Sequence, residues 1–185
     1  MYESSSNKID VLDNIENNSK TINIKEDNLK YHVNEVKNNI SEPEVVIYRV
    51  QDDYQNTVCK IIEKSYKINK KCLLLCNSPE EVELFDSKLW TYSKLSFIPH
   101  GSKYSINTSD AIHCNTWISD DIVLVNTPSY LISLGFVCND NIHYNFEKII
   151  FISYNEHDNL DLIRNKYRNC TVWIKSGNKW IKSTQ

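Results

Sequence analysis

The sequence is organised around residues 88–101, which read Lys88-Leu89-Trp90-Thr91-Tyr92-Ser93-Lys94-Leu95-Ser96-Phe97-Ile98-Pro99-His100-Gly101. The first part continues an amphipathic helix, so we expect Trp90 to be substantially buried at the end of its apolar side. The second part predicts a short apolar strand through Phe97, which Pro99 ends because proline cannot donate a ladder hydrogen bond. Two large aromatic residues, a short spacer and a Pro-His-Gly turn make an uncommon combination.

The chain before this stretch alternates strands and helices. Continuous apolar runs predict buried strands, and apolar residues at helical spacing predict amphipathic helices. Ser78 is a capping residue, Pro79 occupies the first helical position, and Glu81 completes a capping box. The predicted elements are strands at residues 45–48 and 72–76 and helices at residues 58–66 and 79–90.

After the stretch, the pattern predicts further strands, a short helix, a longer helix and a final hairpin. The expected fold class is α/β: a Rossmann-like single domain over residues 44–185, with a mostly parallel central sheet flanked by helices and a C-terminal β-hairpin. The predicted elements are strands at residues 111–117, 122–125 and 148–154, helices at 130–137 and 156–168, and hairpin strands at 171–174 and 179–181.

Residues 1–43 differ from the rest in composition. They contain no Trp, Phe or Cys, and carry eight acidic residues against five lysines. They bury too little apolar surface to offset the entropy of ordering, so we expect a disordered or weakly helical tail. The remaining body is neutral overall, but residues 160–185 hold six basic residues against Asp161 alone.

No apolar run approaches the roughly 20 residues that a membrane helix needs, and the start lacks the pattern of a secretory signal. We therefore expect a cytoplasmic protein without membrane contact. The six cysteines are expected to be buried free thiols. Cys72 and Cys76 on one strand would stand about 13 Å apart, too far to share a zinc ion, and we expect no metal site.

The sequence does not predict a catalytic constellation. Nucleotide-binding loops need glycines where the backbone approaches phosphate, yet the only glycines are Gly101, Gly135 and Gly177. We therefore expect no nucleotide-binding glycine loop and no cofactor. The Asp52-Asp53 and Asp120-Asp121 pairs are expected to be solvated loop acids, and His100 a structural or surface residue.

The central stretch resembles the signature of the chi subunit family of bacterial DNA polymerase III, a clamp-loader accessory protein. In that family a helix ends in Leu-Trp, and a short spacer leads to Ser-Phe-[Ile/Val]-Pro-His, here Leu89-Trp90 and residues 96–100. The resemblance extends over residues 44–182. It includes Asp-Ile-Val-Leu-Val at residues 121–125, Phe-Ile-Ser-Tyr at 151–154 and Arg-x-x-Tyr-Arg at 164–168.

The resemblance implies a monomeric, non-catalytic subunit within a hetero-complex. Such a subunit links the clamp loader, through the psi subunit where one exists, to the acidic C-terminal tail of single-stranded DNA-binding protein during DNA replication. Two alternatives stay open at this point. One is a nucleotide-handling α/β enzyme domain, and the other is a direct single-stranded nucleic-acid binder that uses the basic C-terminal region. Indirect or weak contact with single-stranded DNA is compatible with the adaptor role as well.

The resemblance also implies site residues. Arg164, Tyr167 and Arg168 match positions that receive the acidic tail, and an arginine offers paired hydrogen bonds to a carboxylate. The family often has a basic residue where Leu160 stands, and Lys166 or the hairpin lysines are the candidate substitutes. Without the resemblance these positions read as an ordinary solvated helix face. Phe97 matches a family aromatic at the psi-facing surface, and packing in the core is the equal alternative.

Overall fold

We describe a computed structural model of the chain, which defines residues 42–93, 97–107, 109–136, 146–155, 158–167, 169–177 and 179–183. All of them belong to the unit Ser41–Gln185. The tail expected at residues 1–43 lies almost wholly outside the described residues and stays a prediction. Among the described residues no helix has the length and apolar character needed to cross a membrane.

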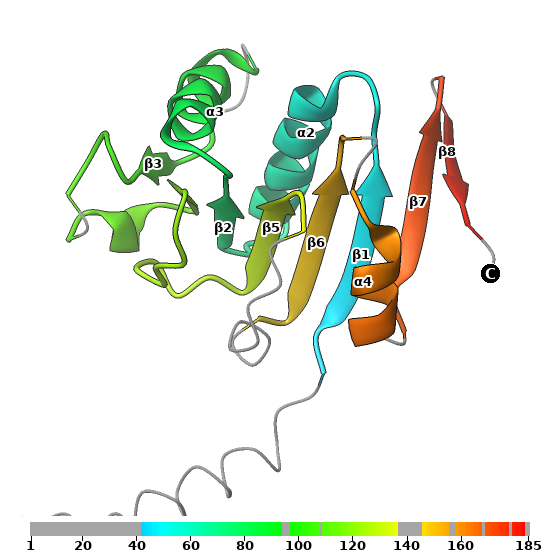
Figure 1. Cartoon of the computed structure of the whole chain (residues 1–185). Coiled ribbons are helices and arrows are strands. Elements are labelled where there is room, and N and C mark those ends of the chain that lie inside the picture. Colours follow the sequence, from blue (N-terminus) through cyan, green and yellow to red (C-terminus); the bar gives the residue numbers. More distant parts are fainter. Residues whose placement is uncertain are drawn as a thin grey trace, which may run out of the picture. The chain divides into compact units, whose positions relative to one another are not determined.

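One eight-stranded sheet forms the centre of this unit (Figure 1). The strands lie in the order β3-β4-β2-β5-β6-β1-β7-β8, and all neighbours run parallel except the last pair, β7 and β8. The expected α/β class with a parallel sheet and a C-terminal hairpin is confirmed. The strands are β1 Glu44–Arg49, β2 Cys72–Leu75, β3 His100–Ser102, β4 Thr116–Ser119, β5 Tyr130–Leu134, β6 Lys148–Ser153, β7 Thr171–Ser176 and β8 Lys179–Lys182.

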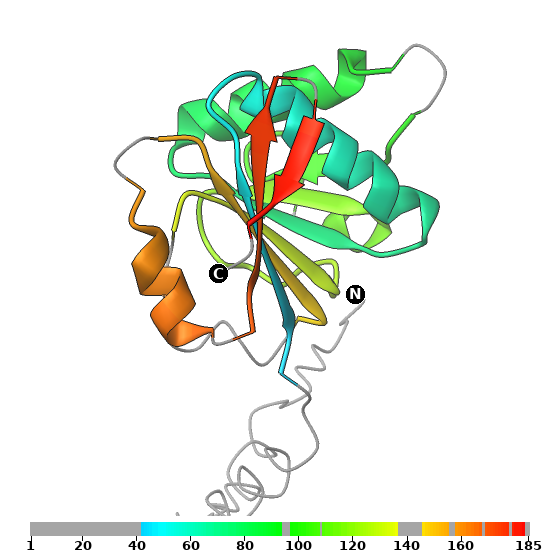
Figure 2. The same cartoon turned by 90° about the vertical axis from the view of Figure 1, so that its right-hand side faces the viewer.

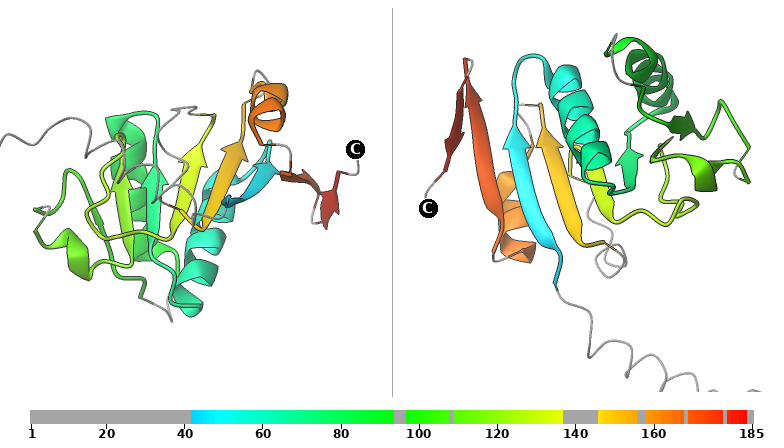
Figure 3. Two further views of the ribbon diagram at one scale, coloured as in Figure 1. Left: turned by 90° about the horizontal axis from the view of Figure 1, so that it is seen from below. Right: turned by 180° about the vertical axis from the view of Figure 1, so that it is seen from behind.

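Two long helices cover one face of the sheet, α2 Tyr54–Lys67 and α3 Pro79–Thr91, as the view from behind shows (Figure 3, right). The chain moves along the sheet in one direction from β1 through β2 to β3 while these helices connect the strands. Right-handed crossovers in one direction place their helices on one face. The buried side chains of this helical face form one cluster: Val58, Cys59 and Ile62 of α2, Val82, Phe85 and Leu89 of α3, and strand residues that include Leu74, Ile118, Ile132 and Ile150.

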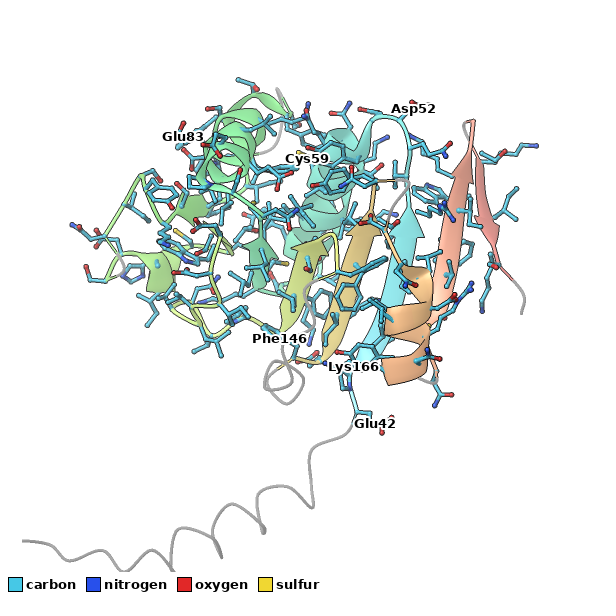
Figure 4. The ribbon with its side chains drawn as sticks, viewed as in Figure 1. Glu42, Asp52, Cys59, Glu83, Phe146 and Lys166 are labelled. Carbon is cyan, nitrogen blue, oxygen red and sulfur yellow. The ribbon has the colours of Figure 1, made fainter. Side chains whose placement is uncertain are left out.

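The buried cysteines belong mainly to this layer, and Cys59 can be seen within it (Figure 4). Burial raises the pKa of the Cys59 thiol to about 11 and that of Cys72 to about 12, and it raises the pKa of Cys76 as well. These thiols are therefore protonated near neutral pH and pack as small apolar groups. The expectation of buried thiols is confirmed for Cys59, Cys72, Cys76 and Cys114, while Cys170 is partly exposed and Cys138 lies outside the described residues.

The opposite face carries the return path from β3 to β7. Its helix, α4 Leu160–Lys166, and the short 3-10 helix η1 Ala111–His113 are both brief. Figure 2 shows α4 and α2 on opposite sides of the sheet. The α4 face has its own cluster, in which Ile163 of α4 contacts Ile47, Phe151, Val172 and their strand neighbours.

The start of α3 agrees with its sequence. Ser78 has extended backbone, and its hydroxyl accepts a hydrogen bond from the Glu81 amide at 3.4 Å. The Glu81 carboxylate accepts a hydrogen bond from the backbone N–H of Asn77 at 2.8 Å. In a capping box this donor is the backbone N–H of the N-cap residue, which is one residue later in the chain. Pro79 takes the first helical position, where it has no amide hydrogen to leave unpaired.

The strand expected around Phe97 is wrong, because the pairing begins after the proline. Residues 97–99 have no strand assignment, and β3 starts at His100. The carbonyl oxygen of Pro99 accepts from the Asn115 and Thr116 amides at 2.8 and 3.1 Å, which starts the pairing with β4. Gly101 lies within β3 where a Cβ would overlap the end of the Ile106 side chain, so a larger residue there would displace Ile106.

Two apolar runs after β4 differ from expectation. Residues 122–125 form no strand, while residues 130–134, expected as helix, form the buried central strand β5. Because β4 and β5 both run parallel to β2, the chain must return from the carboxyl end of β4 to the amino end of β5. Ile122 and Val125 pack on the α4 face during this return. Residues 111–117, expected as one strand, are likewise divided between η1 and the start of β4.

The last elements are close to expectation, although the helix is shorter than predicted and the hairpin strands are slightly longer. β6 and the hairpin strands are confirmed. The helix expected over residues 156–168 begins after Asn159, whose side chain accepts from the Asp161 amide at 3.1 Å, and ends at Lys166. Tyr167 already has extended backbone, and position 168 lies outside the described residues.

Candidate partner-binding surfaces

The carboxyl edge of the sheet, where parallel α/β folds bind nucleotides, is filled here by side chains of the chain itself. Tyr54 of α2 stacks on Tyr154 after β6, with ring centroids 4.3 Å apart and planes 9° from parallel. The Tyr154 hydroxyl donates a hydrogen bond to the Glu81 carboxylate at 2.9 Å and accepts one from the side-chain Nδ2 of Asn77 at 2.9 Å. Burial, followed by the hydrogen bond to Glu81, raises the pKa of Tyr154. This network fastens α2, α3 and β6 together.

The acidic pairs considered above lie in loops, as expected. Lys103 donates to Asp120 and to Asp121, each at 2.9 Å. The hydrogen bond from Lys103 is the largest cause of the lowered pKa of Asp120, and the Ser119 hydroxyl is the largest cause for Asp121. Asp52, at the end of β1 (Figure 4), is exposed. The contacts of Lys103 with Asp120 and Asp121 are those of surface ion pairs.

Trp90 and Phe97 form an exposed aromatic patch at the end of α3. Their side chains are 59% and 58% exposed, and the ring centroids are 5.3 Å apart. The expectation that Trp90 is buried is therefore wrong. The buried residues of α3 are Val82, Phe85 and Leu89, and each residue turns the helix by about 100°. Trp90 thus lies beyond the edge of the stripe that Leu89 completes.

The buried His100 ring packs against the Trp90 ring of the aromatic patch. Its ring nitrogens lie 2.7 Å from the Ile98 carbonyl oxygen and 3.2 Å from that of Asp86, so the ring connects α3 with the segment after the spacer. The Trp90 ring meets the His100 ring edge to face at a centroid distance of 5.0 Å. Ile98 is buried. The two exposed rings therefore rest on a fixed base, which reduces the ordering cost of binding a partner.

The residues expected to receive an acidic tail lie at the end of α4, near the labelled Lys166 (Figure 4). Arg164 has a side chain that is 25% exposed, and it lies 3.7 Å from the Asp161 carboxylate. The Tyr167 ring packs toward the sheet, with its centroid 6.1 Å from that of Phe151. Arg168 lies outside the described residues. The structure thus places Arg164 and Tyr167 within one turn of chain at the end of α4.

Exposed aliphatic side chains share this face of the molecule. Leu162 of α4 is exposed, and so are Ile174 and Ile181, which are register partners across the hairpin. Ile174 lies two residues after Val172 and therefore on the same face of β7 as the α4 cluster. Sequence reasoning missed this apolar surface, although the alternation in β7 and β8 carries the signal.

A family model described as "DNA polymerase III chi subunit, HolC" matches residues 43–173, more than half of the chain. The chain belongs to the DNA polymerase III chi subunit family. A curated relative, the "Probable DNA polymerase III subunit chi" of Rickettsia prowazekii, is 30% identical over 90 residues. That alignment covers 48% of this chain and 53% of the relative, so the chain spans about half the length of the curated relative it matches.

Both candidate surfaces lie inside the chi match. The aromatic patch and α4 with Tyr167 fall within residues 43–173, whereas most of the hairpin, including β8, follows it. Both surfaces therefore belong to the part of the chain that carries the chi family assignment. The hairpin is the part of the described fold to which the family model adds no information.

Proposed function

We propose that this chi protein is a non-catalytic adaptor that links the clamp loader to single-stranded DNA-binding protein in the bacterial cytoplasm. The observation that carries the proposal is the aromatic patch, because two large adjacent rings at more than half exposure are unusual on a protein that works alone. The filled carboxyl edge supports a role without nucleotide chemistry, since Tyr54 and Tyr154 stack where a nucleotide would bind.

The aromatic patch is the proposed contact with a clamp-loader subunit, a psi-like protein where one exists. Rings that are exposed yet held in place are typical of interface hot spots. The double variant Trp90→Ala/Phe97→Ala is expected to abolish association with the purified clamp loader in size-exclusion chromatography. Leu84→Ala is the matched control, because Leu84 is exposed on α3 but on another side of the helix. Equal association of the double variant and the wild type contradicts this contact.

The end of α4 is the proposed site for the acidic tail of single-stranded DNA-binding protein. Arg164 and Arg168 would bind tail carboxylates, and Tyr167 with the nearby aliphatic surface would contact a terminal aromatic ring. Arg164 already lies near Asp161, so an incoming carboxylate competes with that contact. This competition predicts that removing the Asp161 charge strengthens binding.

Fluorescence anisotropy with a labelled acidic peptide ending in Pro-Phe tests this site. Arg164→Ala is expected to weaken binding by roughly 1.5–3 kcal/mol, the range for hydrogen bonds to charged groups, with little change in Tm. Asp161→Asn should tighten binding, and Lys67→Ala on the opposite face should leave it unchanged. If Arg164→Ala and the wild type bind alike, or if removing the terminal Phe changes nothing, the site is assigned wrongly.

The enzyme alternative is tested by thermal shift with ATP, NAD and S-adenosylmethionine. A ligand that binds the folded state raises Tm. The adaptor proposal therefore expects that none of the three compounds changes Tm. A clear rise with one of them contradicts a purely non-catalytic role.

A further inference from the structure

A groove runs between α2 and the C-terminal hairpin, on the sheet face opposite α4. It has a volume of about 360 Å³. Its lining extends from Asp53, before the first residue of α2, to Ile68, after the last. Fourteen helical residues span about 21 Å. Neither candidate surface described above contributes to it.

The groove is open because α2 covers only part of this face. In the view from behind (Figure 3, right), α2 lies over the middle of the sheet, while β1, β7 and β8 extend beyond it. Tyr48 of β1 lines the groove and is only half-buried. Within the described residues no helix packs over the outer strands on this side. The sheet itself is therefore one wall of the groove.

Lysines from three separate elements line the groove: Lys60 and Lys64 of α2, Lys148 of β6 and Lys175 of β7. Lys148 contacts Glu44 at 2.9 Å, and Lys175 lies 4.0 Å from Asp53. Within the part of the chain that the structure describes, Lys60 and Lys64 form no ion pair. Asp53 is the sole acidic residue in the lining, so the groove carries net positive charge.

Aromatic rings alternate with lysines on the sheet wall. Trp180 of β8 meets Tyr48 edge to face, with centroids 5.1 Å apart, and remains 38% exposed. Trp180 is the register partner of Lys175, and both residues line the groove. Register partners lie on the same face, so this wall presents rings and ammonium groups in turn.

We propose that this groove binds single-stranded nucleic acid. A positively charged groove that follows the backbone, with aromatic rings that stack on bases, is the general solution for binding single strands. The basic residues are all lysines, which neutralise phosphates as point charges and do not need the fixed fork geometry with which arginine recognises carboxylates. At 3.4 Å or more per phosphate along a strand, the groove accommodates at most about six nucleotides.

The proposal goes beyond the adaptor function and does not depend on it. Trp180 lies outside the residues that the chi family model matches, so the stacking wall is a feature of this chain. The groove would hold a nucleic-acid strand on one face of the sheet, while the end of α4 would bind the acidic tail on the other face. The two activities are separable by mutation.

The test uses fluorescence anisotropy of the full chain with a labelled 20-nucleotide oligothymidylate in a salt series. Lys64→Ala/Lys175→Ala is expected to weaken binding at least tenfold and to reduce the salt slope by about 1.4, the value for two lost phosphate contacts on a single strand. Lys67→Ala/Lys179→Ala is the matched control. It also removes one lysine from α2 and one from the hairpin and leaves one carboxylate, Glu63, without its partner. Lys179 and Trp180 are neighbours in β8 and point to opposite faces.

The stacking step has its own variants. Trp180→Ala should weaken binding about fivefold to a hundredfold, the range for losing one base stack, and Trp180→Phe should restore most of it. A duplex of the same length should bind at least tenfold more weakly, because its bases are already stacked. Arg164→Ala should have no effect, which separates this site from the proposed tail site.

Several results would overturn the proposal. These are no binding of the oligonucleotide by the wild type at low salt, equal losses in the test and control double variants, or unchanged binding by Trp180→Ala. A duplex that binds as tightly as the single strand has the same consequence. If an acidic peptide occupies the groove more tightly than the oligonucleotide, with the same dependence on Lys64 and Lys175, the groove is a peptide site.

Discussion

The two faces of the sheet are built in different ways. The helical face is covered by α2 and α3, of 14 and 13 residues, and their apolar stripes form one cluster with the strands. The α4 face is covered by a helix of seven residues, a 3-10 turn and the extended return segment that contains Ile122 and Val125. We infer that the helical face carries most of the stability, while the α4 face is held by fewer anchors and opens more easily.

The largest expected effect comes from the thiols buried on the helical face. Burial raises the pKa of Cys59 to about 11 and that of Cys72 to about 12 from the ordinary 9.0. The folded state therefore keeps protons that the unfolded state releases. The contribution of these thiols to the free energy of unfolding is complete below about pH 9. As the pH rises toward 11, each such thiol lowers the free energy of unfolding by about 1.4 kcal/mol per pH unit. Urea unfolding of the reduced protein across this range measures the slope.

The control for this pH profile removes the two thiols. Cys59→Ala/Cys72→Ala should reduce the slope of the profile, and the part that remains includes the contribution of Cys76, whose pKa burial also raises. A flat wild-type profile up to pH 11 would show that the helical face admits water to its thiols.

The next effect separates core from surface within α3. Phe85 is fully buried, so Phe85→Ala is expected to cost about 3–5 kcal/mol. Trp90→Ala, five residues later, should cost less than about 1 kcal/mol, since its ring is mostly exposed and surface substitutions have small effects. Urea melts of the two variants provide the measurement. Similar losses would mean that the aromatic patch belongs to the core.

A third pair compares one anchor from each face. Ile62 of α2 and Ile163 of α4 are both fully buried. Ile62→Ala should cost about 2–5 kcal/mol in global stability. Ile163→Ala should cost less in the global melt, because α4 can detach while the sheet stays folded, and it should instead increase amide exchange in α4. Equal global losses would refute the difference between the faces.

The smallest effect concerns the helix caps. Ser78 caps α3 and Asn159 caps α4, and each substitution by Ala should cost about 1 kcal/mol. The loss from Ser78→Ala should appear as a lower Tm. The loss from Asn159→Ala should appear mainly as faster local exchange in α4, with a smaller change in Tm. If both variants lower Tm equally, α4 unfolds together with the rest of the domain.

The elements that sequence reasoning predicted well are those set by local signals. The cap at Ser78, the periodicity of α2 and the continuous apolar runs of β2 and β6 depend on neighbouring residues only. Residues 122–125, which were expected as a strand and form none, and residues 130–134, which form a strand instead of the expected helix, show the limit of such signals. Both runs are short and apolar, and periodicity alone does not tell a buried strand from another buried segment.

The candidate sites show the same division. The sequence pointed to Phe97 through the family signature, but it assigned Trp90 to the core, although its angular position on α3 lies past the buried stripe. The spacing of Arg164 and Arg168 predicts a shared helical face with Tyr167 beside it, yet the helix ends before Tyr167, and the Tyr167 ring packs toward Phe151. That ending depends on how α4 packs on the sheet, which no local pattern encodes.

By itself the sequence determined the α/β class, the long helices and the chi family, because caps, periodicity and an ordered motif act through residues close together in the chain. The tertiary structure alone decided which strands are neighbours, which rings stay exposed and where lysines gather. The groove makes the reason plain, since Lys64, Tyr48, Lys175 and Trp180 come from α2, β1, β7 and β8. Packing brings these segments together across more than a hundred residues of sequence, a distance over which no residue spacing carries information.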